Sequence, residues 1–222
     1  MNSTQRLRLG KCMTMFGMLM VSITPCRGQD NDSKVADSSK VVFEESFRDP
    51  LAENWQWLRP QHARWCLRNG GLEIRVWAGF ADSVENALLY QVTGRGQDRW
   101  SYEVTVENLS QPKQQWEQAG LTWYSDGRPV FKLVKELVDG KIIVMPGNKP
   151  VPDDAVQLKL EVEGPQIRAY YRTEFNGPYL LAGEGQLPQS DNEQVSIQCY
   201  HGPTDAEHWI RFTDFRVLRQ EK

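Results

Sequence analysis

The stretch QAGLTWYSDGRPVFKLVKELVDG, residues 118–140, decides the fold class. Apolar and polar residues alternate on both sides of a segment rich in turn-forming residues, which predicts a β-hairpin. With the turn at residues 125–129, Tyr124 faces Val130 across the ladder. Three further cross-strand pairs then follow: Thr122–Lys132, Gly120–Val134 and Gln118–Glu136.

This predicted hairpin has two unequal faces, because successive side chains of a strand point to opposite sides. One face is apolar and is expected to pack in a core; it carries Ala119, Leu121, Trp123, Phe131, Leu133 and Leu137. The other face carries Gln118, Thr122, Tyr124, Lys132 and Glu136. The polar face is interpreted either as ordinary solvated surface or as a platform for a ligand.

Short alternating runs separated by turn residues continue on both sides of the hairpin. They predict strands at 41–47, 64–67, 71–77, 87–92, 100–109, 141–145, 155–163, 166–173, 179–184, 194–200 and 209–218. Residues 49–60 are expected to form an irregular connection. No segment of about ten or more residues has helical periodicity, which excludes parallel folds with crossover helices. We therefore predict an all-β fold, a two-sheet antiparallel β-sandwich of jelly-roll type.

The N-terminal residues 1–28 are predicted to be a signal peptide. Arg6, Arg8 and Lys11 precede the apolar segment CMTMFGMLMVSI at 12–23, which is too short to span a bilayer. We expect export to the periplasm or the extracellular space, and no later segment is apolar enough to cross a membrane. A lipid anchor at Cys26 is not expected, since Pro25 fits a lipoprotein cleavage box poorly. Residues 29–40 are polar and predict a disordered linker before a domain at 41–222.

Charge and motif content limit the possible partners. Lys and Arg number 26 against 29 Asp and Glu, with no basic run, so nucleic acid is not an expected partner. No dinucleotide or phosphate-binding motif occurs, and the three His residues lack zinc-site spacing, so neither a cofactor nor a metal is predicted. Cys66 and Cys199 could pair after export or remain free thiols.

Aromatic residues favour a sugar ligand. The chain has eight Trp and seven Tyr, and an aromatic ring can stack on a pyranose while polar neighbours bond its hydroxyls. Alternation places Trp55 and Trp57 on one side, where they either pack under a loop or form a stacking platform at the rim of the sheet. Glu85 and Asn86 could reach the same rim, and His201 is interpreted as incidental.

Paired carboxylates are the main route to an enzyme, because glycosidases place two Asp or Glu residues across the scissile bond. The Glu-x-Asp-x-x-Glu motif of jelly-roll glucanases is absent. Glu136 shares a face with Lys132, and an ammonium group that close stabilises a carboxylate and suits an ion pair better than a general acid. An exposed pair of this kind contributes about 0–1 kcal/mol.

Three sets of residues together resemble a known family. They are Gln118, Ala119, Gly120, Leu121, Asp126, Phe131, Lys132, Glu136 and Asp139-Gly140 in the hairpin, Phe47, Trp55, Trp57, Trp65 and residues 71–74 near the start, and IRFTDFRV at 210–217. Over residues 41–218 the chain resembles the bacterial and fungal "domain of unknown function 1349" family of the concanavalin A-like lectin/glucanase superfamily. The resemblance implies a concanavalin A-like jelly roll, with lectins, glucanases and accessory domains of glycosidases among its relatives.

The chain departs from the family pattern at two positions. Phe131 stands where Trp is usual before the Lys, and Val134 stands where Gly is common. Val134 would lie between Lys132 and Glu136 and could crowd a ligand there.

The sequence thus predicts an exported carbohydrate-binding module. Gln118, Tyr124, Lys132 and Glu136 are expected to contact a glycan or oligosaccharide on a concave face, with Trp57 stacking at the rim. The alternative is a carbohydrate-active hydrolase or lyase with Glu136 as acid/base. A third reading is a structural surface protein without a small ligand.

Overall fold

Residues 39–48, 50–93, 95–96 and 98–221 are described by a computed structural model of the chain. They all belong to one compact unit, residues 36–222. The predicted signal peptide and residues 29–38 of the predicted linker lie outside the described residues.

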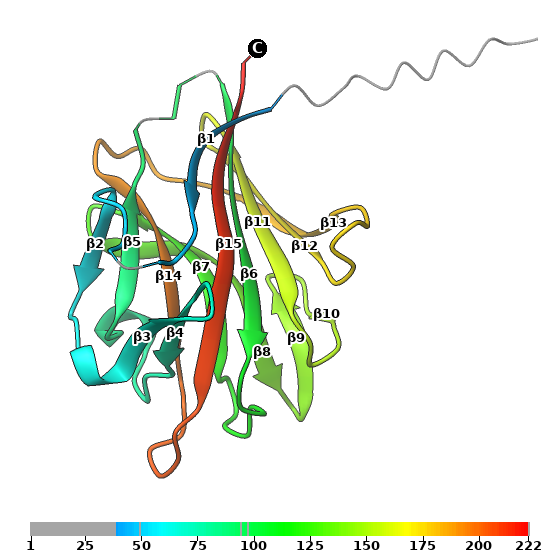
Figure 1. The fold of residues 1–222 in the computed structure, drawn as a ribbon. Coiled ribbons are helices and arrows are strands. Elements are labelled where there is room, and N and C mark those ends of the chain that lie inside the picture. Colours follow the sequence, from blue (N-terminus) through cyan, green and yellow to red (C-terminus); the bar gives the residue numbers. More distant parts are fainter. Residues whose placement is uncertain (1–38, 49, 94, 97, 222) are drawn as a thin grey trace, which may run out of the picture. The chain divides into compact units, whose positions relative to one another are not determined.

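Two antiparallel sheets pack face to face (Figure 1). The first sheet has the order β13 (Leu180–Gln186), β12 (Gln166–Arg172), β11 (Val156–Glu163), β6 (Arg99–Asn108), β15 (Trp209–Gln220), β4 (Gly71–Arg75), β3 (Trp65–Arg68), with β1 (Lys40–Glu45) beside β15. The second sheet has the order β10 (Lys149–Pro150), β9 (Lys141–Met145), β8 (Arg128–Val138), β7 (Gln118–Ser125), β14 (Glu193–Tyr200), β5 (Ala87–Gln91), β2 (Trp55–Leu58). The predicted two-sheet antiparallel sandwich is confirmed.

Helical structure in the described chain consists of two short 3₁₀ turns, η1 (His62–Arg64) and η2 (Ala81–Ser83). Within the described residues no helix has the length and apolar character that a membrane span requires. Strands β2 and β10 were not predicted, since β2 has four residues inside a Trp-rich connection and β10 has only two.

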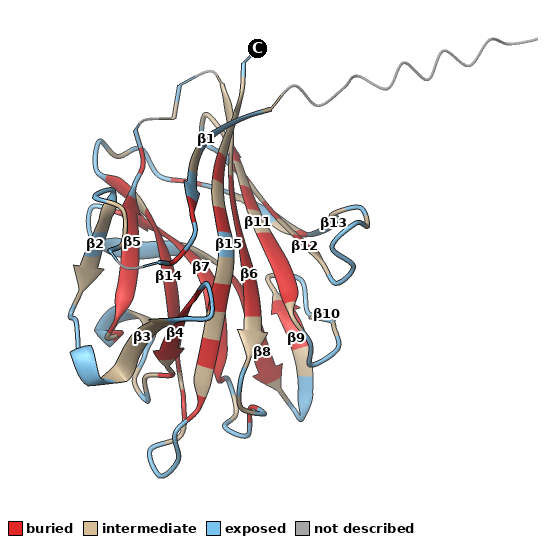
Figure 2. Ribbon diagram, viewed as in Figure 1, coloured by how far each residue is buried: buried red, intermediate tan, exposed pale blue. Residues whose placement is uncertain are grey.

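The core fills the space between the inner faces of the two sheets. Its largest fully buried side chains include Trp123 of β7, Tyr102 of β6 and Phe212 of β15. Figure 2 shows buried residues along the central strands of both sheets, among them β5, β14, β6 and β11. Burying one such side chain contributes about 1.5–3 kcal/mol, which favours the register that turns the apolar side chains of these central strands toward the core.

The β7–β8 hairpin has three of the four predicted cross-strand pairs: Gln118–Glu136, Gly120–Val134 and Thr122–Lys132. The prediction is wrong at the turn, where Tyr124 pairs with Pro129 and a bulge shifts the register. The turn itself is the dipeptide Asp126-Gly127, with φ of 51° and 72°. Asp-Gly favours a two-residue turn because both positions need positive φ, and the bulge absorbs the extra residue.

Cys66 and Cys199 are free thiols, which is the second of the two possibilities that the sequence left open. Cys66 lies opposite Glu73 on the outer side of the first sheet, where its Sγ is 3.8 Å from the Glu73 carboxylate. Cys199 is fully buried in the core, and its Sγ is 3.9 Å from the carbonyl oxygen of Ile74. The two thiols therefore lie on opposite sides of the first sheet.

Candidate functional site

The polar face of the β7–β8 hairpin is covered rather than solvated. Gln118, Thr122, Tyr124 and Glu136 are all buried, and only Lys132 keeps a side chain that is 38% exposed. The cover comes from the segment around η2, where Val84 packs with Tyr200 of β14 and Ala87 of β5. The outer face of the second sheet is thus partly roofed by a loop.

The hydroxyl of Tyr124 is hydrogen-bonded within the protein. Its hydroxyl donates to Oε1 of Gln198 at 2.9 Å, and Nε2 of Gln198 donates to the hydroxyl of Thr122 at 3.0 Å. Ser196 also donates to Oε1 of Gln198, at 2.9 Å. Burial raises the pKa of Tyr124 to about 12. This network holds β7 against β14 and leaves Tyr124 away from the open part of the face.

An open cleft of about 650 Å³ lies between the η2 segment and β8. Its lining has three parts. One wall is Phe80, Ala81 and Asp82 around η2, and another is Pro129, Val130 and Phe131 at the start of β8. A polar floor between them consists of Gln118, Thr122, Lys132, Glu136, Tyr200 and His201. Three predicted ligand residues, Gln118, Lys132 and Glu136, therefore meet in one cleft. Val134 is fully buried and is not part of the lining.

Gln118 is the centre of the polar floor. Lys132 donates from Nζ to Oε1 of Gln118 at 2.8 Å and to Oε2 of Glu136 at 3.2 Å. The Gln118 amide nitrogen donates to the carbonyl of Trp116 at 2.9 Å and lies 3.4 Å from Oε1 of Glu136. Glu136 is only 7% exposed, so this ion pair has one buried partner and one partner that reaches the cleft.

Aromatic rings surround His201 at one side of the cleft. Phe80 stands edge-on at 4.7 Å between ring centroids and 87°, Tyr200 at 5.4 Å and 70°, and Trp116 at 6.3 Å and 50°. Phe80 is 66% exposed and Trp116 is 54% exposed. His201 was interpreted as incidental, and the structure instead places it in the cleft.

Trp57 does not reach this cleft. Its ring stacks on that of Trp65 at 4.5 Å and 29°, and both rings pack against the core where β2 and β3 face each other. The expected stacking at the rim is wrong because the side of β2 that carries Trp55 and Trp57 is its inner side. Packing, the other interpretation of these residues, is confirmed.

Glu85 and Asn86, which were expected to reach the rim of the sheet, are bonded within the protein instead. Glu85 forms an ion pair with Arg64 at 2.8 Å, and the side-chain oxygen of the buried Asn86 accepts a hydrogen bond from the backbone of Gln61 at 2.6 Å. Asp82 is the member of this segment that lines the cleft.

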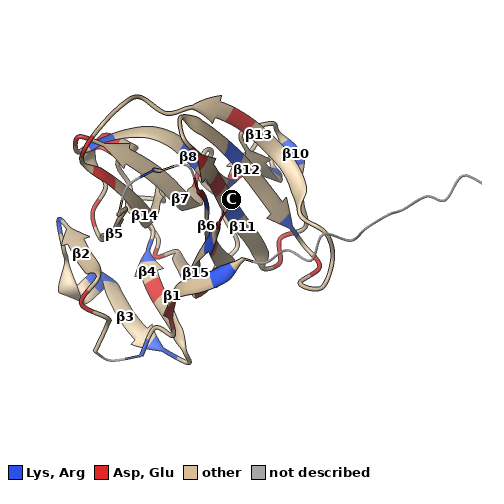
Figure 3. Cartoon of the chain, turned by 90° about the horizontal axis from the view of Figure 1, so that it is seen from above, with Lys and Arg blue, Asp and Glu red and all other residues tan. Residues whose placement is uncertain are grey.

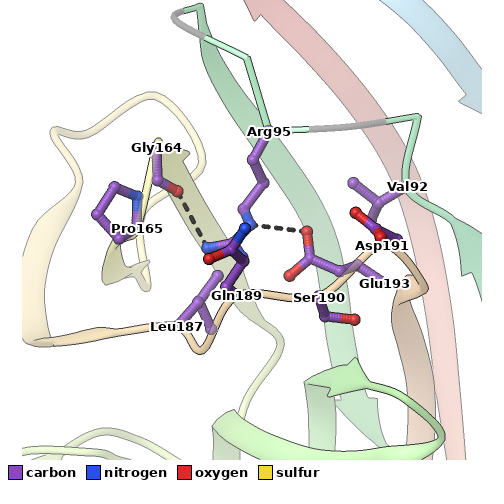
Figure 4. Close-up of a pocket in the computed structure, with 9 residues that line it drawn as sticks. All are labelled: Val92, Arg95, Gly164, Pro165, Leu187, Gln189, Ser190, Asp191 and Glu193. Atoms are coloured by element: carbon purple, nitrogen blue, oxygen red, sulfur yellow. Dashed lines mark hydrogen bonds and ion pairs between the residues drawn. The ribbon is translucent and has the colours of Figure 1, made fainter.

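A second hollow, of about 480 Å³, lies among the loops that follow β5, β11 and β13 (Figure 4). Arg95 reaches across it, donating to Glu193 at 2.7 Å and to the carbonyl of Gly164 at 3.2 Å, and it also donates to the carbonyl of Pro188. Glu193 accepts a further hydrogen bond from Nε1 of Trp123 at 3.2 Å. We call this hollow the Arg95 hollow.

Charged residues of both signs lie along the strands of the first sheet (Figure 3). Arg211 bonds Glu73 at 2.7 Å and Glu107 at 3.2 Å. Burial acts to raise the pKa of Glu73, but hydrogen bonds from Arg211 and Arg68 outweigh it and lower that pKa overall. Among the described residues no group of three or more His, Cys, Asp and Glu side chains is placed to hold a metal ion.

Solved structures with this fold include glycoside hydrolases and a polysaccharide lyase. The GH43 BlXynB protein from Bacillus licheniformis is similar with a TM-score of 0.66 and 19% identity, over 79% of this chain and 39% of that protein. The xyloglucan PUL GH43B protein from Bacteroides ovatus gives a TM-score of 0.64 and 15% identity, over 78% and 38%. The alginate lyase AlgAT5 from polysaccharide lyase family 7 gives 0.52 and 11%, over 76% and 95%.

These similarities show the fold alone. The chain spans about two fifths of the length of the two GH43 proteins. No curated protein sequence matches the chain.

The family follows from a match over residues 43–178, which is more than half of the 222-residue chain. The superfamily expected from the sequence is thereby confirmed, whereas the narrower resemblance to the domain of unknown function 1349 stays a prediction. The chain belongs to the beta xylosidase C-terminal concanavalin A-like domain family.

Proposed function

We propose that the protein is a carbohydrate-binding module and that its ligand lies in the cleft of Gln118, Lys132 and Glu136. The observation that supports this best is the combination of a polar floor with an exposed aromatic wall. Lys132 offers a partly exposed ammonium group beside a buried carboxylate, and Phe80 offers a ring that is 66% exposed. Hydroxyl groups of a sugar can donate to the carboxylate and accept from the ammonium group, while an apolar sugar face packs on the ring.

The charges around the cleft favour an electrically neutral ligand. Lys132 faces Glu136, and the guanidinium of Arg59 donates to the backbone carbonyl of Asp82 at 2.8 Å. Two cations and two carboxylates therefore lie in or beside the cleft. A neutral oligosaccharide binds there without leaving an unpaired charge.

The family supports a role on carbohydrate, because it takes its description from a domain of beta xylosidases. The solved structures are less than 20% identical to this chain, so similarity alone does not transfer their activities to it. The binding function therefore rests on the cleft.

An acid/base role of Glu136 in a hydrolase or lyase is the alternative. The cleft holds a second carboxylate, Asp82, which comes from the opposite wall, and glycosidases use two such groups. Against it, the Glu136 side chain is only 7% exposed, and its carboxylate already lies 3.2 Å from Nζ of Lys132 and 3.4 Å from the Gln118 amide nitrogen. Binding without turnover is therefore the function that we favour.

Calorimetric titration with xylohexaose, cellohexaose and mannohexaose, combined with a reducing-sugar assay, separates these functions. A binding module binds at least one oligosaccharide without turnover, and Glu136→Gln weakens that binding. A hydrolase or lyase shows turnover that Glu136→Gln abolishes while circular dichroism stays unchanged. Glu184→Gln, at a side chain that is 65% exposed on β13, is the matched control. Failure to bind any plant, algal or bacterial glycan contradicts both and favours a structural surface protein.

We also propose that the protein is exported. The positive residues Arg6, Arg8 and Lys11 before a short apolar segment support a signal peptide at 1–28. The resemblance of the hairpin and of residues 210–217 supports the closer relationship to the domain of unknown function 1349. N-terminal sequencing of the protein secreted from its host tests the first proposal, with a mature start near residue 29 as the expected result.

A further inference from the structure

His201 carries a buried nitrogen with no partner in the cleft. Its Nε2 makes no hydrogen bond to any described residue and is buried, although the imidazole ring lines the cleft. A buried donor without a partner costs free energy comparable to a lost hydrogen bond, so such a group needs an explanation. The explanation comes from the neighbours of the other ring nitrogen, Nδ1.

The orientation of the Gln118 amide is fixed by Lys132. An ammonium group only donates, so the atom of Gln118 that lies 2.8 Å from Nζ must be the oxygen. The NH₂ group of Gln118 is then directed to the Trp116 carbonyl, and it also lies 3.4 Å from Nδ1 of His201. A nitrogen that faces an NH₂ group is favourable only as an acceptor.

The tautomer of His201 follows from this orientation. If Nδ1 accepts, the neutral imidazole carries its proton on Nε2, because one ring nitrogen donates when the other accepts. Lys132 therefore acts through Gln118 to place an N–H group on the nitrogen of His201 that has no partner among the described residues.

The backbone around His201 is held by hydrogen bonds, whereas the Phe80 ring beside the imidazole is largely exposed. The backbone N–H of His201 donates to Gly79 at 3.1 Å, and that of Gly202 donates to Trp77 at 2.8 Å. These bonds hold residue 80 beside the imidazole. The Phe80 ring itself is 66% exposed, so rotation of its side chain costs little packing.

We propose that the Nε2–H of His201 is a ligand donor of the carbohydrate cleft, covered by Phe80 in the free protein and given to a sugar oxygen when the ring rotates to pack on the sugar. This inference rests on the proposed function and adds a specificity-determining residue to it. An oxygen of a neutral pyranose, accepting from His201, would satisfy the unpaired donor, while Lys132 and Glu136 bond neighbouring hydroxyls.

Long-range ¹H–¹⁵N spectra of the ¹⁵N-labelled full chain test the tautomer without any ligand. The chain has three His residues, so a His201→Asn spectrum identifies the His201 signals. We expect Nδ1 of His201 without a proton and Nε2 with one. Gln118→Glu replaces the NH₂ group with an acceptor and should move a proton to Nδ1, and Lys132→Met should lose the single fixed tautomer. Lys159→Met, on β11 of the other sheet, should leave the signals unchanged. A proton on Nδ1 in the unsubstituted protein overturns the assignment.

Titration with xylohexaose, cellohexaose and mannohexaose tests the donor role. We expect His201→Phe, which keeps a ring and loses the donor, to weaken binding on the order of tenfold. His201 has φ of 61°, and His201→Asn is the second variant because Asn tolerates positive φ. Unchanged affinity in both variants overturns the donor role and leaves the proposed function intact. Absence of binding by the unsubstituted protein counts against both, and the tautomer is then still decided by the spectra.

Discussion

The cleft and the Arg95 hollow both place a cation against a buried carboxylate, yet their polar atoms are used differently. In the Arg95 hollow, Arg95 bonds three protein acceptors, two on loops and one on β14, and Glu193 is shared between Arg95 and Trp123. In the cleft, Lys132 keeps a side chain that is 38% exposed, and Nε2 of His201 has no partner among the described residues.

This difference distinguishes an ion pair that stabilises the fold from a cleft that can bind a ligand. We call a buried ion pair whose nitrogen atoms all bond protein acceptors a structural tie. Removing one partner of such a pair leaves the other buried and unpaired. A cleft with a partly exposed cation and a ring nitrogen that has no described partner retains hydrogen-bonding capacity for a ligand. The hydrogen-bond partners of the polar atoms therefore distinguish the two hollows.

The largest effect on stability is expected at the Arg95 hollow. Glu193→Leu leaves Arg95, which is 12% exposed, and Nε1 of Trp123 without their carboxylate. We expect a loss of about 3–5 kcal/mol in the free energy of unfolding, measured by urea denaturation. Asp191→Asn, at an exposed residue of the same hollow, should change it by less than about 0.5 kcal/mol. A loss below about 1 kcal/mol for Glu193→Leu would show that Arg95 is not a structural tie.

Glu136→Gln is expected to change stability little and ligand affinity strongly, the reverse of Glu193→Leu. The amide keeps the shape of the side chain, and Lys132 can turn to solvent, so the free energy of unfolding should fall by no more than about 1 kcal/mol. Affinity for the bound oligosaccharide should fall about ten- to hundredfold, since hydrogen bonds to a charged group are lost. Calorimetry and urea denaturation of the same preparation measure both quantities. Unchanged affinity beside a large loss of stability would make the cleft a second structural tie.

Phe80→Ala tests the aromatic wall. Because the ring is 66% exposed, stability should stay within about 0.5 kcal/mol of the starting value. Affinity should fall about fivefold, corresponding to about 1 kcal/mol of ring contact. Phe175→Ala is the matched control, since Phe175 is 46% exposed in the loop between β12 and β13. An equal loss of affinity in both variants would exclude a specific role for Phe80.

The Tyr124 hydroxyl is expected to stabilise the fold near neutral pH and to lose this contribution in alkali. Burial raises its pKa from 10.0 to about 12, so the folded protein holds the phenol proton longer than the unfolded chain. The corresponding stability is complete below pH 10 and is lost as pH rises toward 12. Tyr124→Phe should therefore cost about 1 kcal/mol at pH 7 for the bond to Gln198, and less at pH 11. Thermal unfolding at both values checks this, and a penalty that grows with pH would contradict it.

Alternation was sufficient to predict the fold because every central strand buries one face. It also placed Gln118 opposite Glu136 and Thr122 opposite Lys132, since their register is fixed by inward-facing residues such as Leu121 and Leu133. The prediction failed at Asp126-Gly127, where turn chemistry and not alternation sets the local register.

The walls of the cleft could not be predicted in the same way. Phe80 and His201 are 121 positions apart in the chain and meet only because the backbone around Trp77 pairs with Tyr200. Alternation says that Trp55 and Trp57 share a side, but not that this side faces the core. Alternation placed Tyr124 on the correct face of the hairpin. It did not predict that the Tyr124 hydroxyl donates to Gln198 and so is used inside the protein.

Backbone chemical-shift mapping during titration with xylohexaose, cellohexaose and mannohexaose tests the central claim most directly. The account predicts that the bound sugar shifts the amide signals of Gln118, Lys132, Glu136 and His201, while those of Arg95 and Glu193 stay unchanged. Shifts confined to the Arg95 hollow or to the outer face of the first sheet, with the cleft signals unmoved, would contradict it.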